Sequence, residues 1–236
     1  MKVSGILYGV GIGPGDPELL TLKAVAILKK ADVIAVPKSK EEADSRALSI
    51  VEKMVDCKGK EILELILPMT KEKEILAKAR KEVAALISEK LKQGKVVACI
   101  TLGDPLFYST FSYLIPLVMN ALPEVTVKII PGVSSINAAS SAALLPLAEA
   151  DEKIAVIPST YEQEGLKEII RGFDTVVLMK VNRVMDKVLT VLEELALKGK
   201  ATFVSRAGWP EEMVIRDLDS LKGKELDYFS MVIVKK

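Results

Sequence analysis

Residues 9–17 read Gly-Val-Gly-Ile-Gly-Pro-Gly-Asp-Pro, with glycine at every second position from 9 to 15. The segment follows a strand-like apolar run at 6–10 and precedes a helical pattern over 17–30, for which Asp16 is a good N-cap. A strand, a glycine turn and a capped helix open a βαβ unit. Because glycine lets a ligand approach the backbone closely, we expect this turn to line a binding site. The alternative is a tight turn with no ligand.

Strand-like and helix-like segments alternate along nearly the whole chain, which predicts an α/β fold with mainly parallel sheets. Half of the residues are hydrophobic but only 5% are aromatic, so the core is aliphatic, as in parallel sheets buried on both faces. A polar break at 120–124 predicts two α/β domains, over residues 1–120 and 121–236. Three closely spaced strand-like segments, 201–204, 213–216 and 231–234, predict hairpins and mixed pairing near the C-terminus.

Composition excludes several classes of function. The formal net charge is +1, which argues against a nucleic-acid-binding protein. There is no histidine, so triads and zinc sites that need one are excluded. Cys57 and Cys99 show no metal-ligand spacing, and we expect no metal site. The N-terminus does not resemble a signal peptide and no apolar run is long enough to cross a membrane, so we expect a cytoplasmic protein without a membrane partner.

Two further glycine turns follow predicted strands. Residues 101–110 read TLGDPLFYST, in which Asp104 is expected to cap a helix over 106–120 or to belong to a ligand-binding loop. Residues 130–144 read IPGVSSINAASSAAL, in which Ser134 and Ser135 are candidate N-caps and the small residues allow close packing or leave room for a ligand. The first turn does not have the spacing of the dinucleotide motif GxGxxG, which argues against a nicotinamide-dependent oxidoreductase. Three such turns suggest a bulky ligand held mainly by backbone contacts.

Four segments together resemble the tetrapyrrole methylases: GVGIGPGDPELLTLKA (9–24), ADVIAVP (31–37), GDPLFYSTFSYL (103–114) and PGVSSINAASSAALLPLAEADE (131–152). Within that family, AVPKS (35–39), SRALSIV (45–51) and the 103–114 segment resemble enzymes that methylate carbon 20 of precorrin-2 or cobalt-factor II in cobalamin biosynthesis. The resemblance implies a homodimer of chains with two α/β domains. It also implies that S-adenosylmethionine, the methyl donor, binds in a cleft between those domains.

The resemblance also carries over candidate residues. Those that match donor-contacting positions are Pro14, Leu102, Gly103, Asp104, Phe107, Ser134, Ser135, Met179 and Ala207. The tetrapyrrole carries several carboxylates, so basic residues near predicted strand ends are candidate substrate contacts, although each is also consistent with a solvated surface charge. These are Lys38, Arg46, Arg183 and Arg206. Pro37 occupies the position at which uroporphyrinogen-methylating relatives carry an aspartate, so that branch fits less well.

Methyl transfer from a sulfonium to an electron-rich carbon chiefly requires that the reacting atoms be held in line, which suits a chain without histidine. A proton must then leave carbon 20, and a substrate carboxylate, water or Asp104 are candidate bases. Two other functions stay open. One is a methylase of the same family acting on another precorrin, ribosomal RNA or a diphthamide precursor. The other is a non-enzymatic tetrapyrrole-binding protein.

Overall fold

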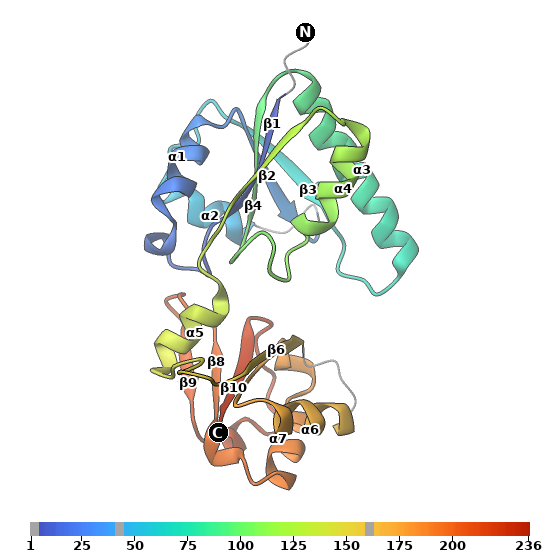
Figure 1. The fold of residues 1–236 in the computed structure, drawn as a ribbon. Helices are drawn as coiled ribbons and strands as arrows, with labels where there is room; N and C mark the ends of the chain where they lie inside the picture. The colour runs from blue at the N-terminus through green and yellow to red at the C-terminus, as the bar shows by residue number, and fades with distance from the viewer. Residues whose placement is uncertain (1–4, 41–44, 159–162) are drawn as a thin grey trace. The chain divides into compact units, whose positions relative to one another are not determined.

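The computed structural model describes residues 5–40, 45–158 and 163–236, and its chain divides into two compact units, residues 1–134 and 135–236 (Figure 1). In the described ranges, no helix combines the length and apolarity that crossing a bilayer requires. The first unit contains β1 (Ile6–Gly11), η1 (Pro17–Leu19), α1 (Leu22–Lys30), β2 (Val33–Lys38), α2 (Arg46–Glu52), β3 (Glu61–Ile66), α3 (Lys73–Lys92), β4 (Val96–Thr101), α4 (Phe111–Ala121) and β5 (Thr126–Ile130).

The five strands of the first unit form one sheet in the order β3-β2-β4-β1-β5, and every pair is parallel. Helices α1 and α2 cover one face of this sheet and α3 and α4 cover the other (Figure 1). Burial on both faces explains the continuous apolar runs of β2 and β4. The expected α/β class with mainly parallel strands is confirmed.

The second unit contains α5 (Ser135–Ala143), β6 (Ile154–Pro158), α6 (Gln163–Gly172), β7 (Thr175–Met179), η2 (Val181–Arg183), α7 (Met185–Glu194), η3 (Lys198–Lys200), β8 (Ala201–Ser205), β9 (Met213–Ile215), η4 (Leu218–Leu221) and β10 (Ser230–Lys235). Its sheet has the order β6-β7-β10-β8-β9, with one parallel pair and three antiparallel pairs. This confirms the expected mixed pairing near the C-terminus. Alternate residues of β7 face opposite sides: Leu178 packs with α6 and α7, and Val177 packs with α5.

The structure differs from the sequence-based elements in three places. Strand β5 pairs with β1 in the first sheet, so the chain passes to the second unit after Ser134 and not at the polar break at 120–124. The helix expected over 17–30 is divided: Asp16 caps the short η1, and Thr21 caps α1 by accepting from the N–H of Ala24 at 3.1 Å. The helix expected from residue 106 begins at Phe111.

Candidate functional site

The three glycine turns of the first unit meet at the carboxyl edge of its sheet. The N–H of Gly103, after β4, donates to the carbonyl of Gly13, after β1, at 2.8 Å. A Cβ added to Gly11 would lie 2.6 Å from both the carbonyl oxygen of Gly103 and the nitrogen of Gly132. Only glycine fits such an approach of three main chains. The turns around Pro14, Gly103 and Gly132 therefore meet at one edge of the sheet.

Asp104 ties two of these turns together. Its Oδ1 accepts from the N–H of Leu106 at 2.8 Å, and its Oδ2 accepts from the N–H of Gly132 at 3.1 Å. Of the two roles expected for Asp104, that of helix cap is wrong, because α4 begins at Phe111 and the carboxylate is bonded to the loop and to the chain after β5. Both carboxylate oxygens hold backbone amides, so Asp104 acts on the shape of the site.

The loop between Asp104 and α4 exposes three large apolar side chains. Leu106, Phe107 and Tyr108 are 55%, 41% and 51% exposed, and the two rings meet edge to face with centroids 5.0 Å apart. Ser109 fixes the far end of this segment: its hydroxyl bonds to that of Thr101 at 3.0 Å and accepts from the N–H of Phe111 at 3.2 Å. An apolar surface that is exposed and yet anchored at both ends is typical of a ligand-binding loop.

The remaining donor candidates of the first unit lie close to this junction in the chain. Pro14 is buried directly after Gly13, which has a φ of 78°, and Leu102 is half-buried beside Gly103, which has a φ of 68°. Ser134 is the last residue of the first unit. The Gly13–Gly103 bridge brings the turns of Pro14, Leu102 and Asp104 together at one edge of the sheet.

The donor candidates of the second unit also gather at one end of a sheet. Strands β7 and β8 lie on either side of β10, and both are antiparallel to it, so their carboxyl ends lie at the same edge. Met179 ends β7 and Ala207 follows β8, and both belong to the apolar cluster under α5. Ser135 is the first residue of α5.

The four substrate candidates have different surroundings. Lys38, at the end of β2, bonds to Glu64 at 2.9 Å, and only 10% of its side chain is exposed. Arg46 and Arg183 are exposed, on α2 and at the end of η2. Arg206 donates from Nε and Nη2 to one oxygen of Asp227 at 2.9 and 2.8 Å, and this hydrogen bond raises the pKa of the guanidinium.

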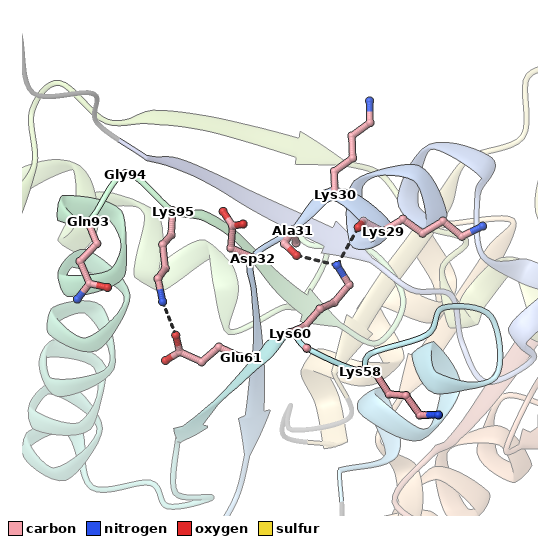
Figure 2. A pocket seen from close by; sticks show the side chains of 11 residues that line it. Lys29, Lys30, Ala31, Asp32, Lys58, Lys60, Glu61, Gln93, Gly94 and Lys95 are labelled. Atoms are coloured by element: carbon pink, nitrogen blue, oxygen red, sulfur yellow. Dashed lines mark hydrogen bonds and ion pairs between the residues drawn. The ribbon is translucent and has the colours of Figure 1, made fainter.

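A lysine-rich hollow of about 670 Å³ lies at the opposite, amino edge of the first sheet (Figure 2). Its central ammonium, that of Lys60, caps the end of α1 by donating to the carbonyls of Lys29 and Ala31 at 2.7 and 2.8 Å. Lys95 bonds to Glu61 at 2.7 Å. The other lysine side chains extend in different directions instead of converging, so the hollow does not present a joined set of cations to a polyanionic substrate (Figure 2).

The sequence does not predict the backbone conformation of two residues that follow strands at the carboxyl edges of the two sheets. Tyr108 and Lys180 have left-handed backbones, with φ of 52° and 58°, although neither is glycine. Tyr108 lies inside the 103–114 segment, but nothing in that segment indicates its conformation. Lys180 follows Met179 directly and has no motif of its own. Across the described ranges, no three His, Cys, Asp or Glu side chains come together closely enough to hold a metal ion.

Comparisons with known proteins identify the family of this chain. A family model described as Tetrapyrrole (Corrin/Porphyrin) Methylases matches residues 6–221. A probable cobalt-precorrin-2 C(20)-methyltransferase of Methanocaldococcus jannaschii is 40% identical, covering 98% of this chain and 96% of that protein. A precorrin-2 C(20)-methyltransferase of a Sinorhizobium species is 34% identical, covering 98% and 95%.

Solved structures share the fold at lower identity. A cobalt precorrin-4 methyltransferase superposes with a TM-score of 0.73 at 24% identity, covering 97% of this chain and 94% of that one. A uroporphyrin-III C-methyltransferase of Thermus thermophilus, solved with S-adenosylhomocysteine, gives 0.70 at 24% identity, covering 98% of each chain. Since the family model spans most of the sequence and the relatives match over nearly their full length, the chain belongs to the tetrapyrrole (corrin/porphyrin) methylases.

Proposed function

We propose that the protein transfers a methyl group from S-adenosylmethionine to carbon 20 of precorrin-2 or of its cobalt-containing form, in cobalamin biosynthesis. Relatives that are 32–40% identical over nearly the whole chain carry that activity in their names. The observation in this molecule that carries the proposal is the convergence of the turns at Gly11, Gly103 and Gly132. A methylase for a different acceptor would use the same junction, so only the identity of the methylated product distinguishes the two.

The junction suits a nucleoside-type donor. It presents main chain with no room for a Cβ at Gly11 or Gly132, and the loop that follows Gly103 carries the exposed ring of Phe107. We propose that the donor contacts are those predicted from the sequence: Pro14, Leu102, Gly103, Asp104, Phe107 and Ser134 in the first unit, and Ser135, Met179 and Ala207 in the second. When bound, the sulfonium supplies a methyl group that is already activated for displacement.

The reaction forms a bond between the methyl carbon and carbon 20 and breaks the bond between methyl and sulfur, whose electron pair stays on sulfur. A proton then leaves carbon 20. The protein's part is to hold the reactants in line and to exclude water, which is catalysis by proximity and orientation. Because both oxygens of Asp104 accept from backbone amides, we favour a substrate carboxylate or water over Asp104 as the proton acceptor.

The test is incubation with methyl-labelled donor and either metal-free precorrin-2 or its cobalt form, followed by mass spectrometry and NMR of the product. We expect a single added methyl group on carbon 20. A Gly132→Ala variant should be inactive, because its Cβ would overlap the carbonyl of Gly103. Gly172→Ala is the matched control, since a Cβ on Gly172 would meet nothing within 4 Å. No transfer to either form, or a methyl group on another carbon, refutes the proposed acceptor.

The resemblance also supports a homodimer acting in the cytoplasm, without nucleic-acid or membrane partners, and we propose these as well. Sedimentation velocity at micromolar concentration tests the dimer, and a single monomeric species would refute it.

A further inference from the structure

Two cationic residues lie at corresponding places in the sheet of the second unit. Lys180 follows β7 and Arg206 follows β8, on either side of the first residues of β10. The N–H of Lys180 donates to the carbonyl of Ser230 at 3.0 Å, and that of Arg206 donates to the carbonyl of Phe229 at 2.8 Å. The main chain therefore holds both residues at the edge that also contains Met179 and Ala207.

Both residues have a left-handed backbone, with φ of 58° at Lys180 and 49° at Arg206. This conformation is unfavourable for a residue with a Cβ and costs glycine nothing. Here a long charged side chain is retained at such a position, at the edge of a ligand site. Strain of this kind indicates that the side chain has a function there.

The two cations differ in what neutralises them. Arg206 is bonded to Asp227 at 2.8 Å and lies 3.7 Å from a carboxylate oxygen of Glu211. Lys180 is exposed, and within the described ranges no carboxylate lies at ion-pair distance from its ammonium. Its Nζ instead lies 5.9 Å from the centre of the Tyr228 ring, which is 41% exposed. Lys180 thus has an ammonium available to an anion, beside an open aromatic face.

We propose that Lys180 binds a peripheral carboxylate of the tetrapyrrole and that Tyr228 contacts the methylene groups of the same side chain. The inference rests on the proposed function and adds a specific substrate contact to it. The ammonium supplies the charge that a carboxylate requires, and the aromatic ring supplies an apolar surface next to that charge. Arg206, which the sequence suggested for this role, has its charge satisfied within the protein and holds the loop after β8.

The experiment compares Lys180→Gly, Lys180→Arg and Lys224→Met with the wild type. Lys224 is an exposed lysine of the same unit and serves as the matched control. Removing the Lys180 side chain should raise the KM for the macrocycle about tenfold, with kcat and the affinity for S-adenosylhomocysteine within about twofold. The arginine variant should retain most of the affinity, and Lys224→Met should behave like the wild type. Because glycine is unstrained at this position, Lys180→Gly should unfold at the wild-type temperature or above it.

An unchanged KM in a stably folded Lys180→Gly variant overturns the inference. A parallel loss of S-adenosylhomocysteine affinity also overturns it, because the effect would then pass through the donor site. A binding experiment separates failure of this inference from failure of the proposed function. Uroporphyrin, a porphyrin polycarboxylate, is titrated into the protein, and the quenching of Trp209 fluorescence measures its binding. Trp209 is the only tryptophan, and it stacks on Phe229 with ring centroids 6.4 Å apart. Weaker binding by Lys180→Gly supports the role of Lys180 even if no methyl group is transferred, and equal binding refutes it.

Discussion

Replacing Asp104 with alanine tests whether the donor site is shaped by the link between its loops. The change removes two backbone hydrogen bonds, one to the exposed N–H of Leu106 at 2.8 Å and one to the partly buried N–H of Gly132 at 3.1 Å. A solvent-exposed bond contributes about 0.5–1 kcal/mol, and a partly buried bond to a charged acceptor contributes about 1.5 kcal/mol. Asp104→Ala should therefore lower the free energy of unfolding by about 2 kcal/mol.

Asp16→Ala is the matched control, because the Oδ1 of Asp16 accepts from the N–H of Glu18 at 2.9 Å, also two residues ahead, and the bond is exposed. It should cost about 0.5–1 kcal/mol, as expected for a bond confined to its own turn. Asp104→Asn retains one acceptor oxygen and should lie between Asp104→Ala and the wild type.

Urea unfolding followed by circular dichroism measures the free energies, and calorimetry measures the affinity for S-adenosylhomocysteine. Without Asp104, the loop after β4 and the turn at Gly132 are no longer linked and should shift apart. Asp104→Ala should therefore lose at least tenfold in affinity for S-adenosylhomocysteine, about 1.4 kcal/mol, while Asp16→Ala stays within about twofold. Equal stability losses in the two alanine variants would refute the loop-link argument. A loss of affinity without extra destabilisation would show that Asp104 acts only through the proposed donor contact and not through the link between the loops.

Three further predictions concern stability and thiol chemistry. Tyr108→Gly releases about 1–2 kcal/mol of left-handed strain but removes the edge-to-face contact with Phe107 and frees the unfolded chain, each costing about 0.5–1.5 kcal/mol, so the free energy of unfolding should stay within about 1 kcal/mol of the wild type; a larger loss in urea experiments would contradict this. Hydrogen bonds from Lys90 and Lys95 lower the pKa of Glu61 in the folded protein below its usual value of 4.5. The ionised carboxylate therefore stabilises the fold above about pH 4.5, and this contribution is lost as the pH falls through the pKa of the folded state. Glu61→Gln should reduce the pH dependence of urea unfolding below about pH 4.5. Burial raises the pKa of the Cys99 thiol to about 12, so in the native protein iodoacetamide at pH 8 should modify Cys57 first, as peptide mass spectrometry will show; faster labelling of Cys99 would contradict it.

Local chemistry in the sequence is sufficient to predict the α/β class and the meeting of the three turns. Apolar runs that end in glycine place the turns after strands, and parallel strands bring their carboxyl ends to one edge. The cap at Asp16 is also local, since its partner is the N–H of Glu18. These features depend on residues close together in the chain, or on a direction that all strands of one sheet share.

Long-range pairing accounts for what the sequence does not predict. The pattern of β5 marks it as a strand, but only its pairing with β1 assigns it to the first sheet. Residues 106–110 resemble the start of a helix after Pro105, but the bonds of Asp104 to Gly132 and of Ser109 to Thr101 hold them in a loop. The conformation of Lys180 depends on the bond to Ser230, at a distant place in the chain.

The junction of Gly11, Gly103 and Gly132 has a consequence for how such enzymes diversify. Its surface consists of amides and carbonyls, so its shape depends on three residues that must stay small and is insensitive to the identity of most side chains around it. Mutations at loop positions that do not hold this junction together can therefore alter the choice of methyl acceptor and leave the junction, which we propose to hold the donor, unchanged.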